Sequence, residues 1–196
     1  MTTARKLAPA GVAAVLALTA PVPALAEAGT SPAARTTRAS EHAAPSLAVP
    51  AAHASARDRA YLRQAHRSNL AEIEAGRAAL RRSHDRDVKE IAWRLVRDHR
   101  RLDARLREVA DRLRVGLPDR PGAGQRERLA DVLDRPGRRF DRAWLRLQAE
   151  AHEQALWLGR REVRAGHSRW VKDLARDAAP VVRHHLHMVR AELDDR

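Results

Sequence analysis

The chain has 196 residues, and its 38 lysines and arginines against 25 aspartates and glutamates give a formal net charge of +13 with histidine neutral. It contains no cysteine, which excludes disulfides, thiolate metal sites, cysteine nucleophiles and lipidated cysteine anchors. The length suits one domain with a modest core. The sequence carries no Ser/His/Asp spacing, no phosphate-cradling glycine loop and no HExxH helix. We therefore expect a noncatalytic binding or structural protein with a role in stress tolerance, and leave enzyme activity open.

The first 26 residues have the form of a secretory signal peptide. Arg5 and Lys6 precede an almost wholly apolar run over residues 8–20, and residues 24–26 form the small-x-small pattern that signal peptidase recognises. The apolar run is too short to span a bilayer comfortably, and prolines interrupt it at its end. We predict cleavage after Ala26 and a secreted, extracytoplasmic protein of the periplasm or cell wall; a retained signal anchor is the alternative.

Residues 27–56 are rich in alanine, serine, threonine and proline, with almost no large apolar side chains. Such a stretch cannot bury enough surface to order itself, so we predict a disordered tether. A low-complexity spacer without function explains the composition equally well. No second apolar run of about 18 residues follows, so we expect no transmembrane segment after the signal has been removed.

From Asp58 onward, apolar residues recur every three or four positions, the spacing that lines one face of a helix. The pattern predicts four long helices over about 58–82, 84–114, 139–165 and 168–195. Between the second and third lies a connection over residues 115–139, rich in glycine and proline, with a short helical piece at about 125–134. This connection is long enough for the crossover of a ferritin-like bundle. We predict an all-α fold, a ferritin-like four-helix bundle over residues 57–196.

The predicted second helix has the most regular apolar seam, with the steps of three or four that are typical of a coiled coil. Its members are Val88, Ile91, Leu95, His99, Leu102, Leu106, Val109 and Leu113. His99 occupies a position on this seam where leucine or valine would serve stability better. His185 does the same on the fourth helix, and His152 lies on a line next to the apolar face of the third.

Three predicted helices therefore point an imidazole inward near their midpoints, and the first helix offers Glu72 at a comparable height. Neutral imidazoles with one carboxylate suit Zn, Cu or Fe, so His99, His152, His185 and Glu72 are candidate ligands of one metal ion. A ferritin-type di-iron centre is disfavoured because it needs a glutamate three residues before two of the histidines. The residues at those positions are Val96, Ala149 and Val182.

A buried polar network is the competing interpretation of the same histidines. In it, each imidazole would bond to a residue such as Asp98, Gln148, Asn69 or Asp141 and thereby fix the register of the helices. We favour this interpretation over the metal site on sequence grounds, because buried polar groups usually satisfy one another. Closely spaced imidazoles in the structure would favour metal, and separated ones would favour the network.

The basic surface suggests anionic partners such as acidic envelope polymers or lipid headgroups. The arginines are spread over all helices and interleaved with acidic residues, without a stripe of aromatics, so we expect no specific nucleic-acid partner. The excess of arginine over lysine also fits a coding bias toward GC-rich codons. Assembly of several copies into a homo-oligomer stays open.

Motifs on all four long predicted helices carry a family resemblance. Their residues are Asn69, Leu70, Ala71, Glu72, Ile73, Glu74, Val88, Lys89, Asp98, His99, Phe140, Asp141, Arg142, Leu145, Gln148, His152, Pro180, Val182, His185 and Leu186. Through these motifs, residues 60–193 resemble a bacterial family of exported proteins known as domain of unknown function 4142, which is grouped with the ferritin-like superfamily. The resemblance implies a ferritin-like four-helix fold in the cell envelope, with no established activity. Trp144 departs from the resemblance, which implies tyrosine more often at this position.

Overall fold

We describe residues 53–196 of a computed structural model of the chain. These residues form five α-helices and no strand, which confirms the predicted all-α fold. The predicted signal peptide, its cleavage site at Ala26 and the tether up to residue 52 lie outside the described residues. The helices are α1 (Ala56–Arg82), α2 (Arg86–Arg112), α3 (Ala123–Leu133), α4 (Gly137–Ala165) and α5 (Arg169–Asp194).

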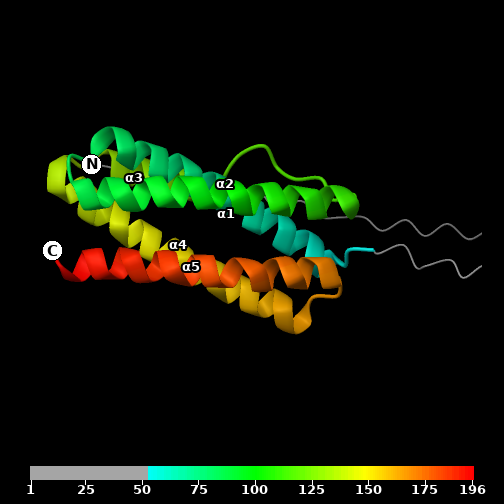
Figure 1. The fold of residues 1–196 in the computed structure, drawn as a ribbon. Coiled ribbons are helices and arrows are strands. Elements are labelled where there is room, and N and C mark those ends of the chain that lie inside the picture. The colour runs from blue at the N-terminus through cyan, green and yellow to red at the C-terminus, as the bar shows by residue number, and fades with distance from the viewer. Residues whose placement is uncertain (1–52) are drawn as a thin grey trace, which may run out of the picture. The chain divides into compact units, whose positions relative to one another are not determined.

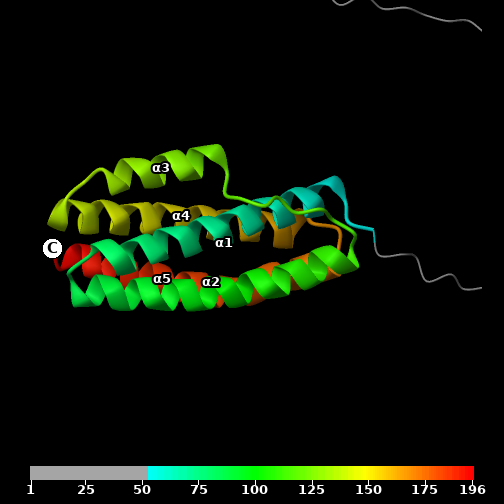
Figure 2. The same ribbon diagram turned by 90° about the horizontal axis from the view of Figure 1, so that it is seen from above.

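The four long helices form a bundle of two antiparallel pairs, α1 with α2 and α4 with α5 (Figures 1 and 2). The pairs meet through contacts of α1 with α4 and of α2 with α5. Between α2 and α4 the chain returns along the outside of the bundle and includes α3, which packs on α1 and α4 (Figure 2). This long crossover confirms the predicted connection and makes α2 and α4 run in the same direction, as one long crossover does in ferritin-like bundles.

Side-chain caps set the first residues of α1 and α2. Ser55 and Asp58 form a capping box, in which the Asp58 N–H donates to Ser55 Oγ over 3.1 Å and the Ser55 N–H donates to Asp58 Oδ2 over 2.6 Å. Asp85 accepts from the Asp87 and Val88 N–H groups at the start of α2. The helix boundaries thus agree with the predicted ones to within about two residues.

The end of α2 at Arg112 is closed by Arg114 and Val115, before the first glycine of the connection. Arg114 takes the left-handed conformation with φ of 53°, and the Val115 N–H donates to Ala110 O over 2.8 Å. This pairing closes the helix as a Schellman motif does, although a glycine would adopt the same φ at less cost. The helix therefore ends two residues before its predicted end at about residue 114.

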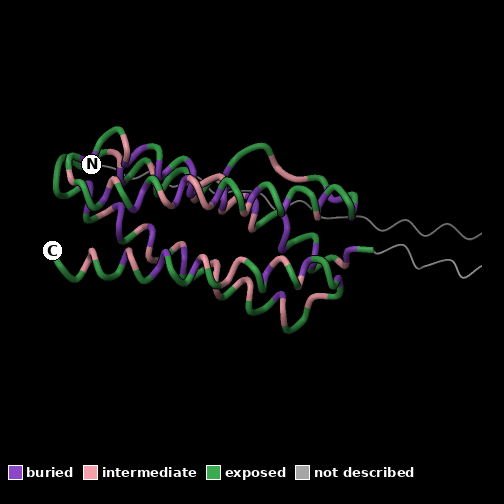
Figure 3. Tube along the Cα trace, viewed as in Figure 1, coloured by how far each residue is buried: buried purple, intermediate pink, exposed green. Residues whose placement is uncertain are grey.

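Apolar side chains form two buried clusters, one toward each end of the bundle. Along the chain trace, buried positions recur on each of the four long helices (Figure 3). The first includes Trp144, Phe140 and Leu95, and the second includes Leu62 and Leu106. On every long helix, the segment between the two clusters carries buried polar residues. The bundle therefore has a polar layer at mid-height, and the candidate histidines lie in it. Within residues 53–196, no helix is both long and apolar enough to cross a membrane.

Candidate metal centre

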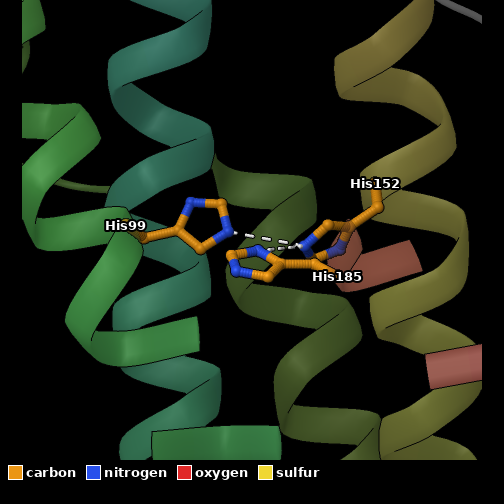
Figure 4. A group of neighbouring side chains, drawn as sticks. All are labelled: His99, His152 and His185. Carbon is orange, nitrogen blue, oxygen red and sulfur yellow. Dashed lines mark hydrogen bonds between the residues drawn. The ribbon is translucent and has the colours of Figure 1, made fainter. Parts of the chain in front are cut away.

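The three histidines predicted to point inward meet at the centre of the polar layer (Figure 4). His99 comes from α2, His152 from α4 and His185 from α5, and all three are buried, with at most 4% of their surface exposed. His152 Nε2 lies 3.4 Å from His99 Nε2 and 3.4 Å from His185 Nδ1. The ring centroids of each pair are 5.4 Å apart. One nitrogen of each imidazole thus faces a common point.

The other nitrogen of each ring has a hydrogen-bond partner on the outer side of this group. His99 Nδ1 lies 3.0 Å from Asn69 Oδ1 of α1, and His152 Nδ1 lies 2.7 Å from the main-chain oxygen of Gln148. His185 Nε2 lies 3.2 Å from Asp98 Oδ2. Asp98 is held in turn by Arg97, whose guanidinium donates to both carboxylate oxygens over 2.8 and 2.9 Å. The Arg97 hydrogen bonds lower the pKa of Asp98 to about 2, so that the carboxylate is ionised.

These outer partners determine where the ring protons lie. An amide oxygen, a main-chain oxygen and an ionised carboxylate only accept hydrogen bonds, so the facing nitrogen of each neutral imidazole carries the proton. The inner nitrogens, His99 Nε2, His152 Nε2 and His185 Nδ1, then hold lone pairs. Two inner contacts of 3.4 Å bring lone pairs together without a donor between them. Three acceptors that converge without a donor form an electron-rich site for a cation.

The spacing fits a single ion of the first transition row. Metal–nitrogen bonds of about 2.0–2.1 Å at tetrahedral angles place ligand nitrogens about 3.3 Å apart. The two inner distances of 3.4 Å match this value, and the three ligand nitrogens all lie within 4.8 Å of one another. Outer hydrogen bonds from a carboxylate and carbonyl oxygens are the usual means by which proteins orient metal-binding imidazoles. The residues present therefore fit a three-histidine metal centre.

The electrostatics keep the imidazoles in the form that binds metal. Burial lowers the pKa of His99 well below its ordinary value, and the neighbouring His152 and His185 lower it further. Burial lowers the pKa of His152 to about 4 against the opposing effect of its bond to Gln148. Burial also lowers the pKa of His185, although Asp98 opposes the shift. All three rings are therefore neutral near pH 7.

Glu72, the fourth candidate ligand, is buried in α1 with 5% of its surface exposed, but it is not part of the group whose ligand atoms lie within 4.8 Å. Its Oε2 has no hydrogen-bond partner in the described part of the chain. Burial raises the pKa of Glu72 to about 8, so the carboxyl group is mainly protonated at pH 7. The structure thus brings together the three predicted histidines and leaves Glu72 beside them as a neutral acid.

Of the residues expected in a polar network, Asn69 and Asp98 contact the histidines, and Gln148 does so through its main chain. Both polar atoms of the Gln148 side chain, and Asp141 Oδ1, have no partner within residues 53–196. The imidazoles are therefore both closely spaced, as a metal site requires, and individually held by polar partners, as a network requires.

Sequence reasoning missed a buried carboxyl pair that joins the start of α1 to the end of α4. Asp58 Oδ1 accepts from the His167 and Ser168 N–H groups over 3.0 and 3.1 Å. Burial and the adjacent Asp58 raise the pKa of Glu162 to about 7. Burial alone would raise the pKa of Asp58 as well, but hydrogen bonds from Ser55, Glu162 and Ser168 lower it to about 2. No spacing in the sequence points to this pair, because Asp58 and Glu162 lie far apart in the chain, on α1 and α4.

A second feature that the sequence did not indicate is a cavity of about 420 Å³ beside the histidines. It extends from His99, His152 and Glu72 toward the turn between α4 and α5, and its wall is mainly apolar. Small side chains on the inner faces of α4 and α5, such as Gly159 and Ala178, leave this space open.

Solved structures that are similar to this chain include two DUF305 proteins and CopM. A DUF305 fragment from Deinococcus radiodurans has 17% identity and a TM-score of 0.66, covering 74% of this chain and 99% of its own. A DUF305 protein from Streptomyces coelicolor, whose name classes it with secreted proteins, has 14% identity and a TM-score of 0.61, with 71% and 91% covered. CopM in the Cu(II)-bound form has 14% identity and a TM-score of 0.56, with 70% and 96% covered. At these identities the likeness shows the fold alone.

No curated protein gives a significant match to this chain. The family model described as "Domain of unknown function (DUF4142)" matches residues 43–191. This range includes α1 to α4, α5 except its last three residues, and the three histidines. The match confirms the resemblance that the motifs on the four long helices indicated. The chain belongs to the DUF4142 family.

Proposed function

We propose that this protein is an exported metal-binding protein that holds one transition-metal ion, copper in preference to zinc or iron, on His99, His152 and His185. One observation carries the proposal: three buried imidazoles turn their lone pairs to a common point, with no donor between them at 3.4 Å. A purely structural network would be expected to place a donor against each acceptor. A bound cation would accept the lone pairs of the three nitrogens.

The preference for copper rests on the donor set and on affinity. Neutral imidazoles suit copper, zinc and iron, and among divalent ions of this row copper(II) binds a given nitrogen site most tightly. The similarity in fold to CopM, which is solved with Cu(II) bound, agrees with this choice. Export is supported by the amino-terminal sequence and by the similarity to a secreted protein from Streptomyces coelicolor.

Each residue around the ion has a distinct task in this proposal. The three histidines would be the ligands, and Asn69, Asp98 and the Gln148 main chain would fix their tautomers and ring orientations. Because the ligands come from α2, α4 and α5, the ion would link both helix pairs of the bundle. The site therefore suits tight holding of an ion.

The test is elemental analysis of the protein, purified without a His tag, together with melting curves in added Cu, Zn and Fe and in chelator. We expect close to one metal ion per chain and a melting temperature that copper raises most. His185→Ala should abolish both results, whereas His187→Ala, an exposed histidine on the same helix, should change neither. If no metal copurifies and none shifts the melt, the proposal is wrong.

That negative outcome would favour a second candidate function, a noncatalytic structural protein of the envelope in which the polar layer fixes the helix register. Its supporting observation is that each outer imidazole nitrogen already has a partner within the bundle.

A further inference from the structure

The cavity beside the histidines has the size and lining of a small-molecule site. Its volume of about 420 Å³ falls within the range of about 300–1,000 Å³ that is usual for ligand pockets. Aliphatic side chains make up much of the wall, among them Leu102 and Leu106 of α2, Leu156 of α4, and Leu174 and Val182 of α5. An apolar ligand body would therefore be buried among apolar side chains, which is favourable in proportion to the area removed from water.

The charged residues of the wall all have one sign at neutral pH. Arg160 and Arg164 on α4, and Arg176 and Arg183 on α5, line the cavity and are exposed to solvent at its edge. Arg176 pairs with Asp173 over 2.6 Å, whereas the other three form no salt bridge within residues 53–196. Three guanidinium groups are thus free to pair with an anion, which arginine does through paired hydrogen bonds.

The inner end of the cavity adds little opposing charge. Glu72 is the only acidic residue on the wall, and its burial keeps the carboxyl group mainly protonated at pH 7. Its Oε2 also lacks a hydrogen-bond partner among the described residues. The cavity thus combines an apolar interior with a cationic edge.

We propose that this cavity binds one amphipathic anion of the fatty-acid class, with its apolar body inside the bundle and its acidic head at Arg160, Arg164 and Arg183. The proposal does not depend on a metal ion, because the apolar wall and the arginines lie on the side of the histidines that faces the α4–α5 turn. It gives the protein a second ligand in addition to the proposed metal.

The test is calorimetric titration of metal-free protein with dodecanoate below its micelle concentration. We expect saturable binding of one dodecanoate per chain, and at least tenfold weaker binding of dodecyltrimethylammonium, which has the same tail and the opposite charge. Arg164→Ala together with Arg183→Ala should weaken the binding of dodecanoate at least threefold. Absence of saturable binding, or equal affinity for the two surfactants, would overturn the proposal.

A cavity-filling variant separates this site from general attraction of anions to a basic surface. A Cβ atom built on Gly159 meets only the Ala175 main-chain oxygen within 4 Å, at 3.9 Å, so Gly159→Leu has room to extend into the cavity. We expect it to reduce the affinity for dodecanoate at least tenfold. Gly124→Leu is the matched control, since Gly124 is exposed on α3 with no atom near its built Cβ. If the two variants lose the same affinity for dodecanoate, or if neither loses any, a cavity site is contradicted.

Two further variants distinguish loss of dodecanoate binding from a folding defect and from loss of the metal site. If circular dichroism shows that Gly159→Leu does not fold, Ala178→Leu fills the same cavity from α5 and carries the same expectation. His185 does not line the cavity, so His185→Gln should remove the metal site and leave dodecanoate binding intact. The failure of one proposal can therefore be told from the failure of the other.

Discussion

At the scale of single residues, the proposed metal binding depends on which nitrogen of each histidine carries a proton. Asn69 Oδ1 lies 3.0 Å from His99 Nδ1 and so leaves His99 Nε2 with its lone pair toward the centre of the group. Asn69 comes from α1, the one long helix that supplies no histidine to the site. In the proposed metal site, Asn69 would therefore position a ligand without contacting the ion.

Asn69→Ala should lower the affinity for copper by about 10–100-fold, the usual cost of losing an outer hydrogen bond to a metal-binding histidine. The affinity can be measured by competition with a chelator of known strength. Ser68→Ala, at the next position on α1, removes a hydroxyl group that does not contact the histidines and should leave the affinity unchanged. Equal effects of the two substitutions would exclude a specific role for Asn69.

Glu162 predicts a pH dependence of stability at the same scale. Its pKa is raised to about 7 in the folded protein from an ordinary 4.5, mainly by burial, so the folded state keeps a proton that the unfolded chain releases. The free energy of unfolding should therefore fall as the pH rises from about 4.5 to 7. Asp58 acts in a lower window, since its lowered pKa of about 2 makes its stabilisation disappear only as the pH falls below about 4.

Glu162→Gln keeps a neutral hydrogen-bonding side chain and removes the titration. Relative to the wild type, the variant should become more stable as the pH is raised from 5 to 8, as measured by urea unfolding at each pH. Glu153→Gln is the control, because Glu153 lies on the same helix in an exposed pair with Arg190. Parallel pH profiles for the wild type and Glu162→Gln would show that Glu162 ionises normally.

At the scale of elements, the close packing of α1 on α2 depends on the absence of a side chain at Gly76. A Cβ atom built there would lie 2.6 Å from Val96 Cγ2 and 3.1 Å from the Ala92 main-chain oxygen. The Val96 side chain can rotate, but the Ala92 oxygen belongs to the helix backbone. This glycine therefore sets the distance between the two helices that present Asn69 and His99 to each other.

Gly76→Ala should lower the free energy of unfolding by about 1–3 kcal/mol, as overpacking of a close contact does, despite the better helix propensity of alanine. Gly124→Ala, where no atom lies within 4 Å of the built Cβ, should be neutral or raise stability by up to about 1 kcal/mol. Urea denaturation with linear extrapolation measures both values. A gain in stability for Gly76→Ala would mean that the helices separate easily.

At the scale of the whole molecule, Trp144 ties the two helix pairs together at one end of the bundle. It is fully buried, and its indole Nε1 donates to the Ala75 main-chain oxygen over 2.9 Å, which links α4 to α1. The same cluster contains Phe140, Leu95 and Val189, so all four long helices meet around this side chain. Trp144 is thus central to the fold of this chain.

Trp144→Ala should destabilise the protein by about 3–5 kcal/mol, a large part of the total for a domain of this size. Trp93→Ala should cost no more than about 1 kcal/mol, because Trp93 is 53% exposed and its main contact is the stacked Arg97. Thermal unfolding followed by circular dichroism compares the two variants. Similar costs for both would contradict the central place of Trp144 in the core.

The sequence by itself determined the helices and which histidines face inward, because both depend on local spacing along a helix. Steps of three or four put His99 on an apolar line, and glycine and proline between residues 115 and 139 required a long connection. From these, convergence of the three histidines at mid-height could be expected. The family resemblance rested on the same segments, and the match over residues 43–191 confirmed it.

Only the tertiary structure decided the distances between the histidines, their tautomers and the cavity beside them. Whether His152 lies 3.4 Å from its neighbours, and which atom faces each outer nitrogen, depends on how four helices rotate about their axes. The pairing of Asp58 with Glu162 and the exclusion of Glu72 from the ligand group depend on contacts between residues far apart in the chain. The pattern along one helix determines on which face of that helix a side chain lies, whereas packing between helices determines which residues the side chain contacts.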